Sequence, residues 1–119
     1  MLIIRNKQRE AFRLYMREKF ERRMSAHLQS RFPEQTNDMT EQSMSDFIRS
    51  GITKAEGYQI VTEGDVQRFL EYMCTLGADF DINSETSWAA EILENEHIDG
   101  SEKIDRIEEY IQSMDDHSI

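Results

Sequence analysis

The chain has 119 residues and a net charge of −10, with 38% hydrophobic and 32% charged residues. A chain of this length buries roughly two-thirds of its unfolded surface, so it can fold as one domain without a partner. Its single cysteine excludes an intramolecular disulfide bond, which suits a reducing compartment. It shows neither a signal peptide nor an apolar run of the ~18 residues that a membrane span needs. We therefore expect a single cytoplasmic domain over residues 1–119.

The charge is divided unevenly along the chain. Residues 1–32 hold nine Lys or Arg and three Asp or Glu, a net charge of +6, whereas residues 33–119 hold five and twenty-one, a net charge of −16. Negative charge on this scale repels nucleic acids and anionic membranes at long range, so we expect neither as a partner. It favours a basic protein partner, whose approach it would steer, although the same charge could serve solubility alone.

Apolar residues recur at intervals of three and four along most of the chain, which is the spacing of amphipathic helices. The pattern predicts an all-α fold, a single-domain bundle of about five helices with a long basic first helix. The predicted helices are about Lys7–Arg31, about Glu41–Glu56, one from Thr62–Asp65 to Gly77, about Thr86–Asn95, and one that begins near Ser101.

Cap and turn residues mark several predicted helix ends. Thr40 is expected as an N-cap, and Thr62 with Asp65 resembles a capping box. Gly57 is expected to stop the second helix. Gly51 lies inside that helix, where glycine costs roughly 1 kcal/mol relative to alanine. It therefore predicts a close crossing with another helix.

The first and last predicted helices each carry a long apolar stripe. Pro33 is expected to end the first helix, and Glu18 is expected to pair with Arg22 inside it. Residues 1–4, MLII, are expected to form a short strand or an apolar strap. The stripe of the last helix suits either the core or a homodimer. The stripes are Phe12, Met16, Phe20, Met24, His27 and Leu28 in the first helix and Ile104, Ile107, Ile111 and Met114 in the last.

The segment GADFDINSETSWAAE begins like the calcium-binding loop of an EF-hand. Asp79, Asp81 and Asn83 stand at loop positions 1, 3 and 5, but Ser84 replaces the glycine of position 6 and Ala90 the bidentate glutamate of position 12. We therefore expect no calcium binding. The polar residues are better explained as turn and cap residues, which hydrogen-bond to nearby backbone.

The apolar residues of the same segment have a structural interpretation. Phe80 and Ile82 are expected to point inward and hold the loop against the core. Trp88, the only tryptophan, is expected to anchor the following helix as a buried side chain. Cys74 is expected to be a small buried hydrophobic residue.

The sequence shows no arrangement of residues that indicates catalysis. His27, His97 and His117 are far apart and lack the spacing of metal ligands. Neither a glycine-rich phosphate loop nor a Gly-x-Ser-x-Gly motif is present. We therefore expect a protein without enzymatic activity, cofactor or metal. The candidate partner-binding residues are acidic residues of the last helix: Glu102, Asp105, Glu108 and Glu109.

Several motifs resemble those of one protein family. They are MLIIRNKQREAF at the start, RFPEQ at 31–35, GI at 51–52, LGADFD at 76–81, WAAEIL at 88–93 and GSEKIDRI at 100–107. In these motifs the chain resembles a family of small bacterial helical proteins encoded beside secreted-toxin genes, often with type VI secretion components. The resemblance covers almost the whole chain and implies an accessory role near such toxins, although none of its motifs names a catalytic residue.

Two functions therefore remain open. The first is a non-enzymatic chaperone or adaptor that holds a secreted toxin or a secretion-system component. The second is an immunity protein that neutralises a basic toxin, for example a nuclease, because its acidic surface mimics nucleic acid. A small enzyme or a calcium sensor ranks below both.

Overall fold

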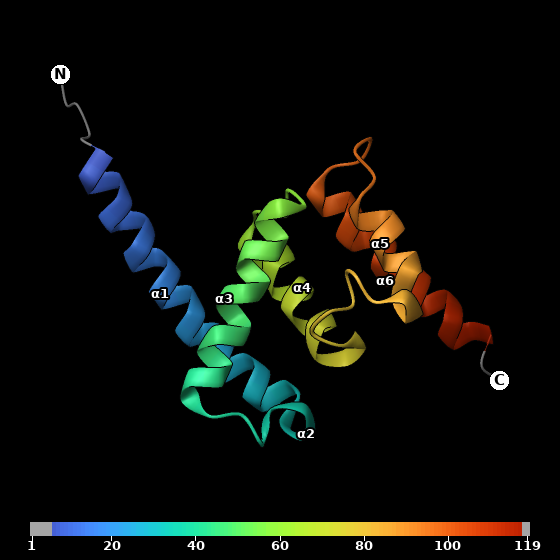
Figure 1. The fold of residues 1–119 in the computed structure, drawn as a ribbon, viewed down its shortest axis with the longest axis horizontal. Helices are drawn as coiled ribbons and strands as arrows, with labels where there is room; N and C mark the ends of the chain where they lie inside the picture. The colour runs from blue at the N-terminus through green and yellow to red at the C-terminus, as the bar shows by residue number, and fades with distance from the viewer. Residues whose placement is uncertain (1–5, 118–119) are drawn as a thin grey trace. The chain divides into compact units, whose positions relative to one another are not determined.

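The computed structural model describes the backbone of residues 6–117 and the side chains of residues 16–115. All regular structure in this range is helical (Figure 1), which confirms the predicted all-α class. The expected strand or strap of residues 1–4 lies outside the described residues. The helices are α1 (Asn6–Arg31), α2 (Pro33–Thr36), α3 (Glu41–Gly57), α4 (Glu63–Leu76), the 3-10 helix η1 (Ser84–Thr86), α5 (Ser87–Leu93) and α6 (Gly100–His117).

The chain divides into two compact units, Met1–Ile48 and Arg49–Ile119, with the boundary inside α3. The first unit holds nine Lys or Arg and seven Asp or Glu, and the second holds five and seventeen. Their net charges are therefore +2 and −12. That the two units form one domain stays a prediction. Within residues 6–117, no helix is both long enough and apolar enough to cross a membrane.

In the first unit, α1 buries one side of its apolar stripe through Phe20, Met24 and Leu28. α1 ends at Arg31, as predicted from the proline. Pro33, however, also begins a one-turn helix, α2, that the sequence analysis did not predict. Proline suits the first turn of a helix because its missing N–H has no intrahelical partner there. With this short helix, residues 6–117 contain six α-helices, one more than the predicted five.

The start of α3 confirms the predicted cap. Thr40 Oγ1 accepts a hydrogen bond from the backbone N–H of Ser43 at 3.0 Å, and the N–H of Thr40 donates back to Ser43 Oγ at 2.8 Å. The predicted pair of Glu18 with Arg22 is not formed, since neither side chain has an ion pair or hydrogen bond with a described residue. Both are exposed, where such a pair contributes only about 0.3–0.5 kcal/mol.

In the second unit, Gly51 lies where α3 crosses α4, which confirms the predicted close crossing. A Cβ at Gly51 would meet the Leu70 side chain and would lie 2.8 Å from Sδ of Met73. Because Gly51 has no side chain, the two helices can approach closely. The packing of α3 on α4 then compensates for the low helix propensity of glycine. The largest fully buried side chains of this unit are Phe69, Phe80, Ile60, Leu70, Leu93, Ile104 and Ile107.

The end of α3 differs from the prediction. Gly57 is the last helical residue, but the chain reverses two residues later, at Gln59, which has a φ of 65°. The N–H of Ile60 donates to the carbonyl of Ala55 at 2.8 Å, and the N–H of Gln59 donates to that of Glu56 at 2.9 Å. This is the Schellman arrangement, which places a left-handed residue just after the helix. Burial of Ile60 fixes the reversal there rather than at the glycine.

A first prediction follows from Gln59. Left-handed backbone costs an L-residue roughly 1–2 kcal/mol, and glycine avoids that cost. We expect Gln59→Gly to raise the free energy of unfolding by about 1 kcal/mol in urea denaturation. Gln59→Ala keeps a Cβ in the same backbone conformation and should change little. Equal effects of the two substitutions would contradict this explanation.

The acidic and aromatic face of helix α6

The first turn of α6 is fixed to the second unit by several contacts. Oδ1 of Asp99 accepts a hydrogen bond from the N–H of Glu102 at 2.8 Å, so Asp99 caps the helix. α6 therefore begins at Gly100, one residue before the predicted start. The Lys103 side chain is 5% exposed, and its Nζ donates to the carbonyl oxygen of Tyr58 at 3.0 Å. Lys103 thus joins α6 to the turn that follows α3.

Polar contacts also align α6 with α4. Near the start of α6, Ser101 Oγ donates to Asp65 Oδ2 at 2.5 Å. About one turn later, Arg68 Nη1 lies 3.0 Å from Asp105 Oδ1. The third contact is a 2.7 Å hydrogen bond from Tyr72 Oη to Glu108 Oε2. Since both members of each pair advance by three or four residues, the two helices run in the same direction.

The four acidic residues predicted to bind a partner differ in their exposure and in the contacts that they make. Glu108 is half-buried and holds Tyr72, and Asp105 is exposed but paired with Arg68. Exposed Glu102 pairs with Arg106 one turn along the helix, at 3.1 Å. Glu109 is exposed and makes no ion pair or hydrogen bond with a described residue. Of these four carboxylates, those of Glu102, Asp105 and Glu109 are therefore exposed, and of these three only that of Glu109 has no ion-pair partner among the described residues.

Glu108 has a structural role that the sequence analysis did not assign. Burial, and after it the hydrogen bond to Glu108, raise the pKa of Tyr72 far above its usual range. The phenol therefore stays protonated and continues to donate its hydrogen bond at neutral pH. The signal for this contact was the position of Tyr72 beside buried Phe69 and Met73 on α4, where a tyrosine needs a partner for its hydroxyl group.

The prediction that Trp88 is a buried anchor is wrong. Its side chain is half-buried and stacks on Tyr110 of α6, with ring centroids 4.1 Å apart and planes inclined by 12°. Ala89 and Leu93, which are fully buried, are the residues that anchor α5. Trp88 lies at the edge of the core because α5 is only seven residues long and turns just one narrow side inward.

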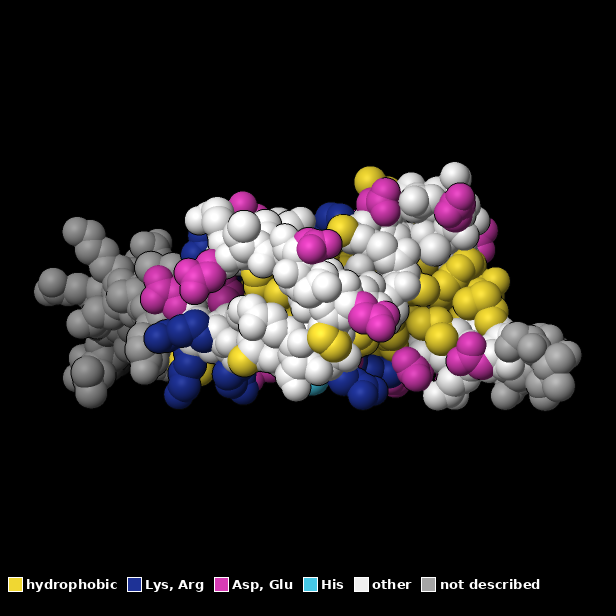
Figure 2. Space-filling model, turned by 90° about the horizontal axis from the view of Figure 1, so that it is seen from below, with side chains coloured by type: hydrophobic (Ala, Val, Ile, Leu, Met, Phe, Trp, Pro, Cys, Tyr) yellow, Lys and Arg dark blue, Asp and Glu magenta, His cyan; other side chains and the backbone are white. Residues whose placement is uncertain are grey.

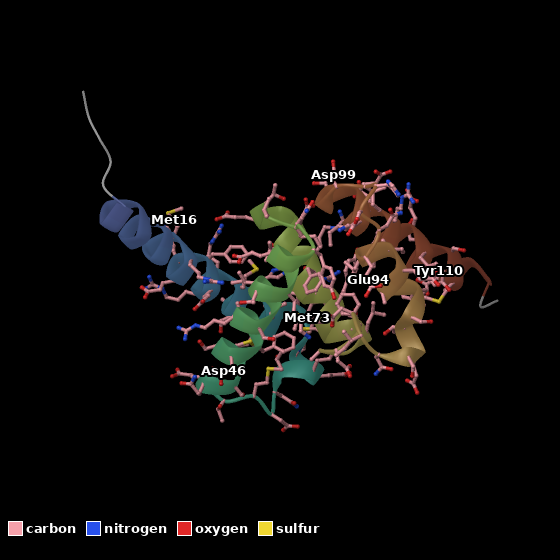
Figure 3. All side chains as sticks on the ribbon, turned by 45° about the horizontal axis from the view of Figure 1, so that its top comes forward. Met16, Asp46, Met73, Glu94, Asp99 and Tyr110 are labelled. Atoms are coloured by element: carbon pink, nitrogen blue, oxygen red, sulfur yellow. The ribbon has the colours of Figure 1, made fainter. Side chains whose placement is uncertain are left out.

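Tyr110 of the stacked pair and Met114, four residues later on α6, form an exposed apolar surface. Their side chains are 40% and 42% exposed. Figure 3 marks Tyr110 on α6, and Figure 2 shows a group of apolar side chains exposed toward the right of the view, with acidic side chains at its margin. An open depression of about 650 Å³ runs beside them, lined by Glu102, Asp105, Arg106, Glu109 and Tyr110.

We define the acidic–aromatic face by the residues of this surface: Trp88, Glu102, Asp105, Glu109, Tyr110 and Met114. It combines aromatic rings with carboxylates that stay in solvent. Tyrosine and tryptophan are enriched where proteins bind one another, and an exposed aromatic ring also attracts the cationic groups of Lys and Arg. The face therefore suits a partner that presents both apolar and basic side chains.

We expect Trp88→Ala to cost only about 1–2 kcal/mol of unfolding free energy, because the side chain is half-buried and its stacking contributes about 0.5–1.5 kcal/mol. If the face binds a partner, the same substitution should weaken that binding at least tenfold, as at an interface hot spot. Trp88→Phe keeps an aromatic ring at this position and is the matched control. A stability loss of 3–5 kcal/mol, measured by urea denaturation, would instead restore the buried-anchor interpretation.

The loop between α4 and η1 has a different role from the acidic–aromatic face. Phe80 is fully buried, as predicted, but Ile82 is 74% exposed, so its expected inward direction is wrong. The buried neighbour is Asp81, which accepts hydrogen bonds from Tyr58 Oη at 2.8 Å and from Lys54 Nζ at 3.3 Å. Two donors satisfy this carboxylate, so a polar residue takes the inward position that Ile82 was expected to fill.

The same network affects the pKa of Tyr58. Burial, and after it the hydrogen bond to Asp81, raise the pKa of Tyr58 to about 12. Tyr58 therefore remains a donor at neutral pH, and Asp81 holds the loop to the end of α3. In the same loop, Asn83 Nδ2 lies 3.4 Å from Asp79 Oδ2 and its side-chain oxygen caps η1. These are the turn and cap roles that the sequence analysis assigned.

The absence of calcium binding stays a prediction. Asp81 is the residue at loop position 3, and its carboxylate contacts Tyr58 and Lys54. A calcium ion would have to replace these contacts. We expect titration calorimetry to show no binding tighter than a dissociation constant of ~10⁻⁴ M, which lies within the range of EF-hand loops. Heat that saturates at lower calcium concentrations would contradict this expectation.

Among the described side chains, the remaining candidates for a functional site are groups of possible metal ligands, Cys74 and a second surface depression. Within the side chains of residues 16–115, no three His, Cys, Asp or Glu residues are grouped to hold a metal ion. Cys74 is half-buried, and burial raises the pKa of its thiol to about 11. A second depression, of about 460 Å³, lies where the turn after α3 meets Leu93 and Lys103. Lys103 holds that turn, so its role is structural.

Comparison with protein-family models, with curated proteins and with solved structures finds no match for this chain. The protein can therefore be described by its fold class and by its acidic–aromatic face, without assignment to a family. The chain is an all-α protein whose acidic second unit exposes an aromatic surface on its last helix.

Proposed function

We propose that the protein is a non-enzymatic accessory protein that binds a protein partner through the acidic–aromatic face. The observation that carries the proposal is the stacked pair of half-buried Trp88 and exposed Tyr110. Beside it lies Glu109, which makes no ion pair or hydrogen bond with a described residue. Because Trp88 is only half-buried and Tyr110 is exposed, the pair leaves rigid aromatic surface that a partner can contact. The −12 charge of the second unit supports a partner with a basic contact surface.

The resemblance of the sequence motifs supports a particular kind of partner. We infer that the protein acts as a chaperone or adaptor for a bacterial secreted toxin or secretion-system component. The alternative is an immunity protein that neutralises a basic toxin. The exposed row of Glu102, Asp105 and Glu109 supports this alternative, since carboxylates spaced by three and four residues share one face of a helix and can attract a basic toxin.

The proposal is tested with the partner recovered by affinity purification from the native host. We expect the association rate to fall by an order of magnitude or more as salt rises, because the Debye length shrinks from about 10 Å at 0.1 M to about 3 Å at 1 M. Glu102→Lys with Glu109→Lys should slow association similarly, while circular dichroism stays helical.

A matched control separates the face from overall charge. Glu94→Lys with Glu96→Lys changes the net charge by the same amount at exposed positions between α5 and α6; Figure 3 marks Glu94. We expect a much smaller effect from this control. An association rate that ignores both salt and the two α6 reversals would overturn the proposal. Inhibition of a toxin partner favours the immunity alternative, and retained toxin activity favours the adaptor.

A further inference from the structure

The apolar stripe of α6 continues beyond the part that the core covers. Ile104 and Ile107 are fully buried, Ile111 is half-buried, and Met114 is 42% exposed. Tyr110 is exposed beside Met114. The last described turns of α6 therefore present the same stripe to solvent that the first turns use for the core, which leaves a helical apolar surface without a cover among the described residues.

The stripe of α1 shows the same change in the opposite direction along the chain. Phe20, Met24 and Leu28 are buried, but Met16 is 38% exposed, and Figure 3 marks it on α1. Phe12 continues the four-residue spacing in the sequence, although its side chain lies outside the described range. α1 therefore also extends an apolar stripe past its covered part.

The charges around these two stripes are opposite. α1 carries eight Lys or Arg and three Asp or Glu, a net charge of +5, whereas α6 carries two and six, a net charge of −4. Lys19 and Arg22 of α1 are exposed and make no ion pair or hydrogen bond with any residue whose side chain is described. Glu109 of α6 is in the same state. The net charges of the two helices are thus opposite in sign.

We propose that the occupant of the acidic–aromatic face is α1 of a second copy of this chain. Met16 of one copy lies against Tyr110 and Met114 of the other, and the two helices run antiparallel. Lys19 and Arg22 then follow Met16 by about 4.5 and 9 Å along α1, while Glu109 precedes Met114 by about 7.5 Å along α6. The basic side chains thereby reach the flank of α6 that carries Glu109 and Glu102.

The contact has consequences for assembly. It joins different surfaces of two identical chains, so it either closes reciprocally into a dimer or extends further. A single pair of helices buries little area, so we expect weak, concentration-dependent association that salt opposes. It also uses the face assigned to the protein partner, so a bound partner and a second copy exclude one another.

The test uses two variants of the full chain and sedimentation velocity at low salt. One variant reverses the acidic side with Glu102→Lys and Glu109→Lys, and the other reverses the basic side with Lys19→Glu and Arg22→Glu. We expect the unmodified chain to associate with rising concentration and each variant alone to remain monomeric. An equimolar mixture should associate again, because each reversed surface meets its complement on the other variant.

A chain with all four substitutions serves as a second control. It should associate like the unmodified chain, since both charge signs are exchanged, whereas damage to the fold would not be repaired. Circular dichroism confirms that each variant remains helical. A chain that is monomeric at every concentration at low salt overturns the proposal, as does association that persists in either single-sided variant. Neither result affects the proposed binding of a separate protein partner, which is measured by its own association rate.

Discussion

Phe80→Ala is expected to lower the free energy of unfolding by about 3–5 kcal/mol, the usual effect of removing a buried phenylalanine. The Phe80 side chain is fully buried, and its ring centroid lies 5.1 Å from that of Phe69 and 6.4 Å from that of Tyr72. Its removal leaves a cavity between α4 and the loop that follows it. For a small domain, a loss of this size is a large part of the total stability.

Ile82→Ala in the same loop is the matched control. Ile82 is 74% exposed, so little apolar area is lost with its side chain, and we expect a change within about 0.5 kcal/mol. Urea denaturation of both variants measures the difference directly. Comparable losses at the two positions would mean that the loop packs with both apolar residues inward, as the sequence alone suggested.

This loop also shows how far sequence reasoning extends. Alternation of Phe80, Asp81 and Ile82 predicts that every second residue faces inward, and that rule selects the two apolar residues. The structure buries Phe80 and its neighbour Asp81 because Lys54 and Tyr58, more than twenty residues away, supply donors for the carboxylate. A contact between distant segments is not visible in local spacing, so the turn was predicted and its direction was not.

The presence of most helices, by contrast, was predictable from local features. Caps such as Thr40 and Thr62, together with apolar spacing, are local features, and the structure confirms both caps. The half-buried position of Trp88 was not predictable. It depends on the short length of α5 and on the stacking of the Trp88 ring on Tyr110 of α6, which local spacing does not show. The acidic residues of α6 show the same limit. The sequence indicated that they are acidic residues of the last helix, but the contact with Tyr72 of α4 determines that Glu108 is held inward, whereas Glu109 makes no ion pair or hydrogen bond with a described residue.

Gly100→Ala is expected to destabilise the fold by about 3 kcal/mol, at the upper end of the usual cost of overpacking. A Cβ at this position would meet the carbonyl oxygen of Gln59 and would lie 2.8 Å from both the Gln59 carbonyl carbon and Cα of Ile60. These are backbone atoms of a turn whose hydrogen bonds are already fixed. The clash therefore cannot be relieved by a side-chain rotation, as it can at Gly51, where the neighbours are the ends of Leu70 and Met73.

Gly64→Ala is the control for the chemical change alone. A Cβ there meets nothing within 4 Å, and alanine is the better helix former, so this variant should be neutral or slightly stabilised. Thermal and urea unfolding separate the two cases.

Relief of the Gly100 clash requires the start of α6 to move away from the turn at residues 58–60, which also strains the contact of Lys103 with Tyr58. Gly100→Ala should therefore weaken the proposed binding of a partner at the acidic–aromatic face without changing any of its residues, because all of them except Trp88 belong to α6. A stable Gly100→Ala variant with unchanged binding would show that α6 is positioned by its contacts with α4 alone.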